Sequence, residues 1–251
     1  MLKKLLKYDL KNIYKVLVVF YILVIFFAIF TRFMLYKDIA IIKIFGQVCS
    51  GITISMIISI IINNIMRLWA RFYNNFYKDE AYLTHTLPIS KKILFLSKFL
   101  TSVITILGSI LVIILSLFIA YYTKDNYNLL LNMVSFKTLI LVIILFILEM
   151  VLLVLSGYFG ILIGQSKNEK KMFKTVLYGF ISYIVNQILF ILVIFVVGVI
   201  NKDVAVIFES NINNFTIINN LLSVGVWYYF ILIIVYYYLC LYIFNKGVNI
   251  E

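Results

Sequence analysis

Residues 139–164 read LILVIILFILEMVLLVLSGYFGILIG, an apolar run with one charged side chain, Glu149, in 26 positions. An α-helix rises about 1.5 Å per residue. About 20 such residues cross the roughly 30 Å of hydrocarbon in a bilayer. The run therefore predicts a membrane-spanning helix.

The composition of the whole chain has the same character. The 251 residues are 65% hydrophobic and 13% charged, with a mean hydropathy of +1.10, which excludes a soluble globular protein. A helix satisfies its own backbone hydrogen bonds in lipid. We therefore expect an all-α polytopic membrane protein, a single domain over 1–251, with spans at 16–35, 39–65, 99–122, 139–164, 176–200 and 226–244.

The charges fix the expected orientation. Twenty-two Lys and Arg against ten Asp and Glu give a net charge of +12, in short blocks that favour lipid headgroups over nucleic acid. With a cytoplasmic N-terminus, 16 of the 22 cations lie inside, and the positive-inside rule then places both termini in the cytosol. The six on the outer side are Arg32, Lys37, Lys43, Lys124, Lys137 and Lys202.

Residues 1–15, MLKKLLKYDLKNIYK, have the pattern of an amphipathic helix at the membrane surface. A simple basic flank to the first span is the alternative. Asp9 falls on the apolar face, where an unpaired carboxylate is costly, so we expect it to pair with Arg67 or Arg71.

The longest cytoplasmic segment, 66–98, predicts a short helix below the membrane. The second span continues as a helix with an inner aromatic belt, and Asp79 and Glu80 suit the first turn of a helix over 79–86. Pro88 ends that helix and Ser90 caps the next. The segment is either a contact for a cytoplasmic partner or a connecting loop. The predicted belt consists of Trp69, Phe72, Tyr73, Phe76 and Tyr77.

Two other connections carry weaker signals. In the inner loop 165–175, Ser166 and Glu169 match a capping box, and Lys170, Lys171 and Lys174 form either a contact surface or a topology signal. On the outer side, 201–225 predicts short helices or a re-entrant segment, because the runs 204–208 and 215–218 are too short to span.

Glu149 is the only acid in a predicted span, so it is a functional candidate. Asn186 and Gln187 lie at a similar depth and are its expected hydrogen-bond partners. The arrangement is either polar packing between helices or a substrate contact in a cavity. Small residues at helix-packing spacing, Ser156, Gly160 and Gly164 and again Gly51, Ser55 and Ser59, predict close helix contacts.

Enzymatic motifs are absent from the sequence. There is no Gly-Lys dipeptide and hence no P-loop, and the one histidine, His85, has no Cys or His at ligand spacing. The two cysteines, Cys49 and Cys240, fall in different spans and suit apolar packing. We expect no catalytic activity, metal or cofactor on this chain.

Residues 78–90, KDEAYLTHTLPIS, resemble the cytoplasmic loop between the second and third spans of ABC-2-type transporter permeases. The six-span layout, the amphipathic start and the outer segment before the last span are also similar to that family. The resemblance implies an exporter transmembrane domain of the type V-like class in a bacterial plasma membrane.

The resemblance further implies that the loop helix is a coupling helix, which contacts a separate ATPase subunit that binds ATP and Mg²⁺. The basic loop, with Lys170 and Lys171, would be a minor second contact. A second permease half, identical or related, would pair with this chain, and the second and fifth spans would line the route. The implied coupling residues are Asp79, Glu80, Tyr82, Leu83, Thr84, His85 and Thr86, and the route residues are Gln47, Asn63, Asn64, Asn186 and Gln187.

The sequence thus favours the permease subunit of an ATP-binding-cassette exporter that moves an amphipathic substrate, such as an antimicrobial peptide or drug, out of the cell and thereby confers resistance to it. An ATP-independent secondary transporter with Glu149 as proton carrier is one alternative, although we detect no inverted repeats. A membrane scaffold or immunity protein that does not transport is the other.

Overall fold

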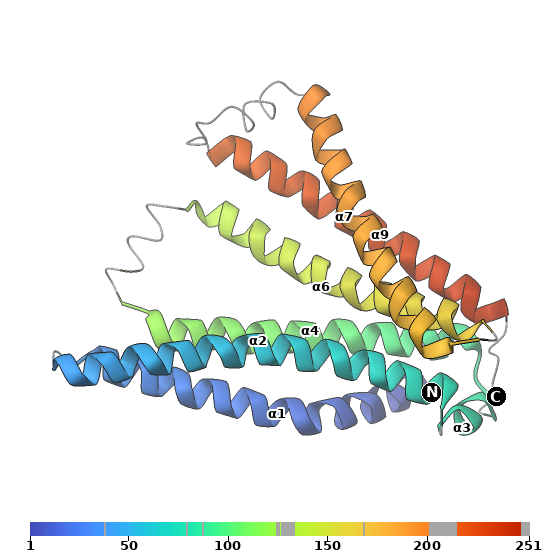
Figure 1. Cartoon of the computed structure of the whole chain (residues 1–251), viewed down its shortest axis with the longest axis horizontal. Helices are drawn as coiled ribbons and strands as arrows, with labels where there is room; N and C mark the ends of the chain where they lie inside the picture. The colour runs from blue at the N-terminus through green and yellow to red at the C-terminus, as the bar shows by residue number, and fades with distance from the viewer. Residues whose placement is uncertain are drawn as a thin grey trace. The chain divides into compact units, whose positions relative to one another are not determined.

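The computed structural model is helical throughout its described part. It describes residues 1–37, 39–78, 80–86, 88–123, 126, 134–167, 169–200 and 215–246, except the side chains of His85 and of residues 215–217. Within these ranges there are seven helices and no strand (Figure 1). The helices are α1 (Leu2–Leu35), α2 (Ala40–Tyr77), α3 (Ala81–Thr86), α4 (Lys91–Tyr121), α6 (Phe136–Gln165), α7 (Lys171–Ile200) and α9 (Phe215–Lys246).

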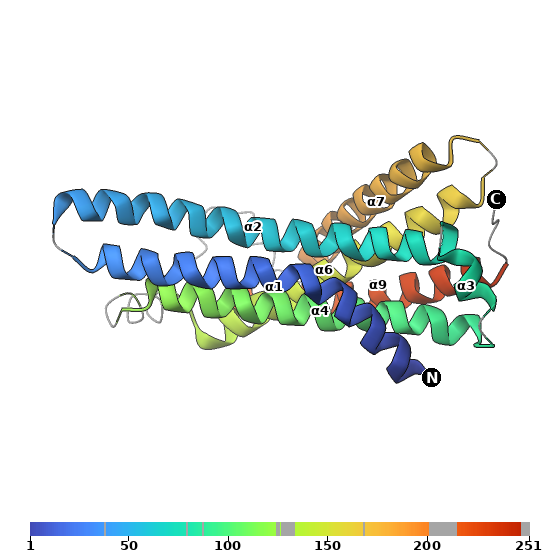
Figure 2. The same cartoon turned by 90° about the horizontal axis from the view of Figure 1, so that it is seen from below.

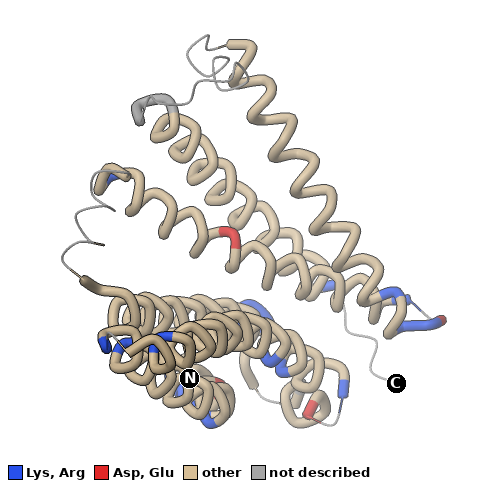
Figure 3. Tube along the Cα trace, turned by 60° about the vertical axis from the view of Figure 1, so that its left-hand side comes forward, with Lys and Arg blue, Asp and Glu red and all other residues tan. Residues whose placement is uncertain are grey.

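All of these helices except the six-residue α3 are long and apolar enough to cross a membrane. Within the described residues, the prediction of six helices with the length and hydropathy to span a membrane is therefore confirmed. Each helix is longer than the span predicted for it, because its ends continue past the apolar run into sequence that is polar but still favours helix. Figure 3 shows most Lys and Arg toward the helix ends, with long uncharged stretches between them.

The chain divides into two compact units. Unit 1 is Met1–Arg71 with Leu96–Leu130, and unit 2 is Phe72–Phe95 with Leu131–Glu251. In unit 1, α1 runs alongside α2 and α4 (Figure 2). The buried residues of α1 recur every three or four positions, so one stripe of α1 faces its neighbours along its length. That stripe consists of Asp9, Ile13, Leu17, Tyr21, Val24, Ala28 and Thr31.

The predicted surface segment 1–15 and the first span form one helix. α1 is continuous from Leu2 to Leu35, and its first turns bend away from the line of the rest (Figure 2). Lys3, Lys4, Lys7, Lys11 and Lys15 are exposed, whereas Asp9 and Ile13 are buried. The buried face of residues 1–15 thus lies on the same side of α1 as the buried face of the span.

In unit 2, α6 and α7 meet at the end where they are joined and spread apart toward the other end (Figure 1). A Cβ added to Gly160 would lie 2.5 Å from the backbone nitrogen of Gly179, and one added to Gly164 would overlap Thr175. The Ser182 hydroxyl donates to the Ser156 carbonyl at 3.4 Å. The predicted close contact along 156, 160 and 164 is therefore confirmed.

The second small-residue stripe makes no such contact. A Cβ on Gly51 would meet nothing within 4 Å, and the hydroxyls of Ser55 and Ser59 donate to carbonyls of α2 itself, at 3.0 and 2.9 Å. Among the described residues, no helix packs closely against Gly51. The expectation of close packing there was wrong for the single chain.

The outer segment predicted at 201–225 is partly corrected. Residues 201–214 lie outside the described residues. Residues 215–225 are not a separate re-entrant element, because they form the first turns of α9. Thr138, at the start of α6, donates a hydrogen bond to the Asn219 side chain at 2.7 Å, and Gly225 lies against Leu145 and Phe190. These contacts stabilise a helix over a stretch whose asparagines suggested a break.

The two glycines provide a matched test of the α6–α7 contact. We expect Gly160→Ala to lower the free energy of unfolding by about 1–3 kcal/mol, since the added methyl meets backbone that has no room to move. Gly51→Ala has open space, so its stability should stay within about 0.5 kcal/mol of the original or rise slightly from helix propensity. Unfolding in detergent measures both, and equal losses would contradict the contact.

Candidate functional site

The short helix α3 presents apolar side chains outward. Tyr82 is 74% and Leu83 68% exposed, whereas Ala81 is buried. The carbonyl of Glu80 accepts hydrogen bonds from the backbone N–H of Thr84 at 3.0 Å and from its hydroxyl at 2.8 Å, which fixes the start of the helix. α3 is therefore anchored on one face and open on the other.

The predicted helix over 79–86 begins two residues later than expected. Asp79 and Leu87 lie outside the described residues, and α3 starts at Ala81. Its first turn has no acidic residue, because Glu80 precedes the helix and acts there through its carbonyl. Thr86 is exposed, and α3 ends there, two residues before Pro88. After it, Ser90 stands just before α4, and its carbonyl accepts from Ile93 and Leu94.

Buried aromatic rings connect the ends of this loop to two long helices. Phe72 stacks on Tyr158 of α6, with ring centroids 4.2 Å apart, and Phe76 meets Phe244 of α9 edge to face at 4.7 Å. Phe95, at the start of α4, lies 6.2 Å from both Phe72 and Phe244. These five rings are almost completely buried. We call Phe72, Phe76, Phe95, Tyr158 and Phe244 the aromatic base.

The aromatic base corrects the predicted interfacial belt. Phe72 and Phe76 were expected at the lipid surface, but both are fully buried. Trp69, Tyr73 and Tyr77 are only half-buried. The two groups have the same helical spacing, but the buried rings are both Phe and the half-buried rings are Trp and Tyr, which have a polar atom.

The loop between α6 and α7 is built differently from the prediction. Ser166 follows the last residue of α6, and its hydroxyl donates back to the Ile163 carbonyl at 2.7 Å. It therefore ends α6 and does not cap α7, so the capping box with Glu169 is wrong. α7 begins at Lys171, after Lys170 with a φ of 47°. Lys170 is exposed and Lys171 is half-buried.

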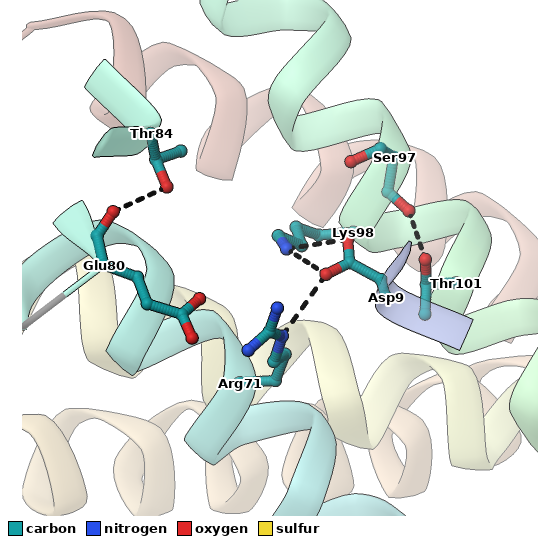
Figure 4. Close-up of polar contacts among 7 residues, drawn as sticks. All are labelled: Asp9, Arg71, Glu80, Thr84, Ser97, Lys98 and Thr101. Carbon is teal, nitrogen blue, oxygen red and sulfur yellow. Dashed lines mark hydrogen bonds and ion pairs between the residues drawn. The ribbon is translucent and has the colours of Figure 1, made fainter. Parts of the chain in front are cut away.

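A buried charge cluster holds unit 1 together at Asp9. Its carboxylate accepts hydrogen bonds from Lys98 Nζ at 2.7 Å to each oxygen, and from Arg71 Nε at 3.3 Å (Figure 4). Side-chain exposures of 2% for Asp9, 7% for Lys98 and 11% for Arg71 place the ion pairs away from water. Arg71 was one of the two predicted partners; the other, Arg67, has a buried Nε with no hydrogen-bond partner in the described structure.

Lys98 was missed as a partner of Asp9. It is 89 residues away in sequence, and it was counted only as an inner cation next to the third span. Lys98 lies one helical turn before Thr101 and Ser102, and such small polar residues on one face of a helix favour contact with another helix. Both are buried, so this pattern could have indicated that Lys98 is buried as well.

Of the predicted route residues in α2, only Asn64 reaches another helix. Its Nδ2 donates to Ser109 Oγ at 2.9 Å, and that hydroxyl also lies 2.7 Å from the Tyr21 hydroxyl. Gln47 is exposed, and Asn63 donates within its own helix to the Ser59 carbonyl at 2.9 Å. Tyr21 and Ser109 were not predicted.

Glu149 and Asn186 do not pair as expected. Asn186 is 3% exposed; its Oδ1 accepts from the Tyr236 hydroxyl at 3.0 Å, and its carbonyl accepts from Tyr228 at 2.7 Å. Within the described structure, Glu149 makes no hydrogen bond and no ion pair. The prediction that Glu149 bonds to Asn186 or Gln187 was therefore wrong.

The register of α6 and α7 explains this difference. The helices run antiparallel, with 164 against 175, 160 against 179 and 156 against 182. The last of these contacts is at 156 against 182, and Glu149 lies two turns further along α6, in the direction in which α6 and α7 spread apart (Figure 1). The depth count used for the prediction took no account of this spreading.

Known proteins do not identify the chain: no family model, no curated protein and no solved structure matches it. Among the described residues, no three His, Cys, Asp or Glu side chains come together as a metal site, and Cys49 and Cys240 are free thiols. The groups available for function are thus the exposed apolar side chains of α3, the packed rings on the helices that flank it, and the hydrogen-bonded polar side chains between the spanning helices.

The charge cluster predicts a large effect of one substitution. Asp9→Leu removes the carboxylate that Lys98 and Arg71 share. Two buried cations then lose this counter-charge, which should lower the free energy of unfolding by about 3–5 kcal/mol. The measurement is denaturation of the purified protein in detergent.

The double variant Asp9→Leu with Lys98→Met is the control. It removes the uncompensated ammonium and should therefore be clearly more stable than Asp9→Leu alone. If Asp9→Leu unfolds like the original protein, the cluster does not stabilise unit 1.

Proposed function

We propose that this chain is the membrane-spanning permease subunit of an ATP-binding-cassette exporter, in the plasma membrane of a bacterium. Six helices able to span a membrane support the transport role, and the resemblance of residues 78–90 to the ABC-2-type loop supports the family. ATP and Mg²⁺ would bind to a separate cytoplasmic ATPase subunit.

The observation that carries this proposal is the exposure of α3. A six-residue helix between two spans ordinarily turns its large apolar side chains inward, yet Tyr82 and Leu83 are the exposed residues here. Exposed aromatic and aliphatic side chains on a fixed support are typical of the centre of a protein–protein interface. α3, with Glu80, Tyr82, Leu83, Thr84 and Thr86, is the surface we assign to the ATPase.

The aromatic base connects this surface mechanically to the spanning helices. Phe72 and Phe95 lie on the helices that flank α3, and they pack on Tyr158 of α6 and Phe244 of α9. Closely packed rings transmit displacement because they have no free volume to absorb it. α6 passes the movement to α7 through the contact of Gly160 with Gly179. A push on α3 thus moves three spanning helices together.

The remaining parts of the proposal follow from charge and exposure. The exposed lysines at the start of α1 contact anionic lipid on the cytoplasmic side. Lys170, at the α6–α7 loop, makes a second, basic contact with the ATPase. A second permease half, the same or a related chain, completes the route, and the substrate is an amphipathic molecule that leaves the cell.

Co-purification tests the proposal. The chain is expressed with its neighbouring genes, including any that carries a P-loop, and the tagged chain is isolated in mild detergent. We expect the ATPase subunit to be retained by the original chain, and Tyr82→Ala with Leu83→Ala to reduce retention at least about tenfold, as expected for loss of two interface anchors.

Tyr36→Ala is the matched control, because Tyr36 is also 72% exposed but follows α1 at the other end of the spans. It should retain the ATPase fully. The proposal fails if no ATPase binds the original chain, or if the double variant binds as well as Tyr36→Ala.

A further inference from the structure

The end of unit 1 where α1 begins and α2 ends has a large excess of positive charge. Its segments 1–15, 66–71 and 96–100 contain eight Lys and Arg but only one acid, Asp9. Lys98 contacts both oxygens of Asp9 at 2.7 Å, and Arg71 contacts one of them at 3.3 Å. One carboxylate cannot neutralise eight cations, so this end of unit 1 attracts anions.

Arg67 is a cation of this region that has no partner in the described structure. It lies on α2 one turn before Arg71, and it makes no hydrogen bond or ion pair with a described residue. Of its three nitrogens, only Nε is a buried atom without a hydrogen bond, so the two Nη atoms reach the surface of the half-buried side chain. Arg67 therefore offers charged N–H donors to a molecule that lies against α2.

An exposed apolar ridge runs along α2 beside Arg67. Ile58, Ile62 and Met66 follow one another at four-residue intervals and are 52%, 55% and 58% exposed. Ala70 continues this row, is also exposed and lies one helical turn from Arg67. From 58 to 70 the helix rises about 18 Å, which exceeds the roughly 15 Å of hydrocarbon in one leaflet of a bilayer. The ridge is therefore long enough to lie along a lipid acyl chain.

A phospholipid matches both features at once. Its phosphate accepts N–H bonds from a planar guanidinium, commonly from two nitrogens together, and its acyl chains cover apolar surface. Inorganic phosphate has no apolar part, and a soluble acidic protein does not reach Ile58 and Ile62, which lie within the predicted second span. The excess of cations around Arg67 favours a headgroup with a net negative charge over a zwitterionic one.

We propose that Arg67 and the ridge over 58–70 form a binding site for one anionic phospholipid: its phosphate pairs with the Nη atoms of Arg67, and an acyl chain lies along Met66 and Ile62. This site differs from the general attraction of the α1 lysines for anionic lipid, because it depends on a single guanidinium and is saturable. It goes beyond the proposed function and requires only this chain.

Native mass spectrometry of the full chain in detergent tests the site, with phosphatidylglycerol as the probe and phosphatidylcholine as the zwitterionic comparison. We expect phosphatidylglycerol to bind at least about fivefold more tightly than phosphatidylcholine. Arg67→Gln should weaken phosphatidylglycerol binding at least about tenfold, because charge-assisted hydrogen bonds to the phosphate are lost. Lys3→Gln removes the same charge from an exposed position of α1 and should change binding less than about threefold.

A second pair of variants at Ala70 keeps the test decisive if Arg67→Gln folds poorly. Ala70→Glu places a carboxylate one turn from Arg67, where it pairs with the guanidinium and repels the phosphate. It should weaken binding at least about fivefold, whereas Ala70→Gln, of the same size and uncharged, should bind within about twofold of the original chain. Ala70 is exposed, so neither side chain disturbs the packing of unit 1.

Four results would overturn the inference: equal binding of phosphatidylglycerol and phosphatidylcholine, equal binding by Arg67→Gln and Lys3→Gln, equal binding by the two Ala70 variants, or displacement of the lipid by inorganic phosphate at equal concentration. The last result would assign the site to a free anion. Retention of the ATPase in the co-purification is a separate measurement, and its failure leaves lipid binding by this chain untouched.

Discussion

The absence of water from the hydrocarbon core is the constraint on which the rest of this structure depends. A polar group placed there must find its partner in the protein. The chain meets this constraint by collecting polar side chains on faces where helices pack, Asn64 with Ser109 and Asn186 with Tyr236. Just outside the predicted spans, it pairs the buried Asp9 with Lys98 and Arg71. Outside these seams the spans are almost entirely apolar.

Two buried or half-buried carboxylates, Asp9 and Glu149, differ in whether the fold supplies them with a partner. Asp9 is satisfied twice, at 2.7 Å by Lys98 and at 3.3 Å by Arg71, and so serves the fold of unit 1. Glu149 lies in α6, which is more apolar than α1, but has no such partner in the described structure.

Sequence reasoning predicted the features that depend on local pattern. Run length and hydropathy predicted six spanning helices, small-residue spacing predicted the Gly160 contact, and the position of Asp9 on an apolar face predicted a cationic partner on α2. Features that depend on three-dimensional neighbours were not predictable. Hydropathy does not tell a lipid-facing ring from Phe72 stacked on Tyr158, and depth counting does not show that the Asn186 amide bonds to Tyr236 and not to Glu149. Ser166 fits the cap of either helix, and only the direction of its hydroxyl shows that it ends α6.

The central claim is that displacement of α3 reaches the spans through the aromatic base. The most direct measurement is the reactivity of a cysteine placed at Ser223, near the far end of α9, toward a water-soluble maleimide. It is made in a Cys49→Ala background, in the complex with the proposed ATPase subunit. Trapping the ATPase with ATP and vanadate should change this reactivity severalfold in the otherwise unaltered chain. Phe76→Leu, which keeps apolar volume but removes the ring between Phe72 and Phe244, should abolish the change while the complex stays intact. An equal response in the Phe76→Leu complex would contradict the account.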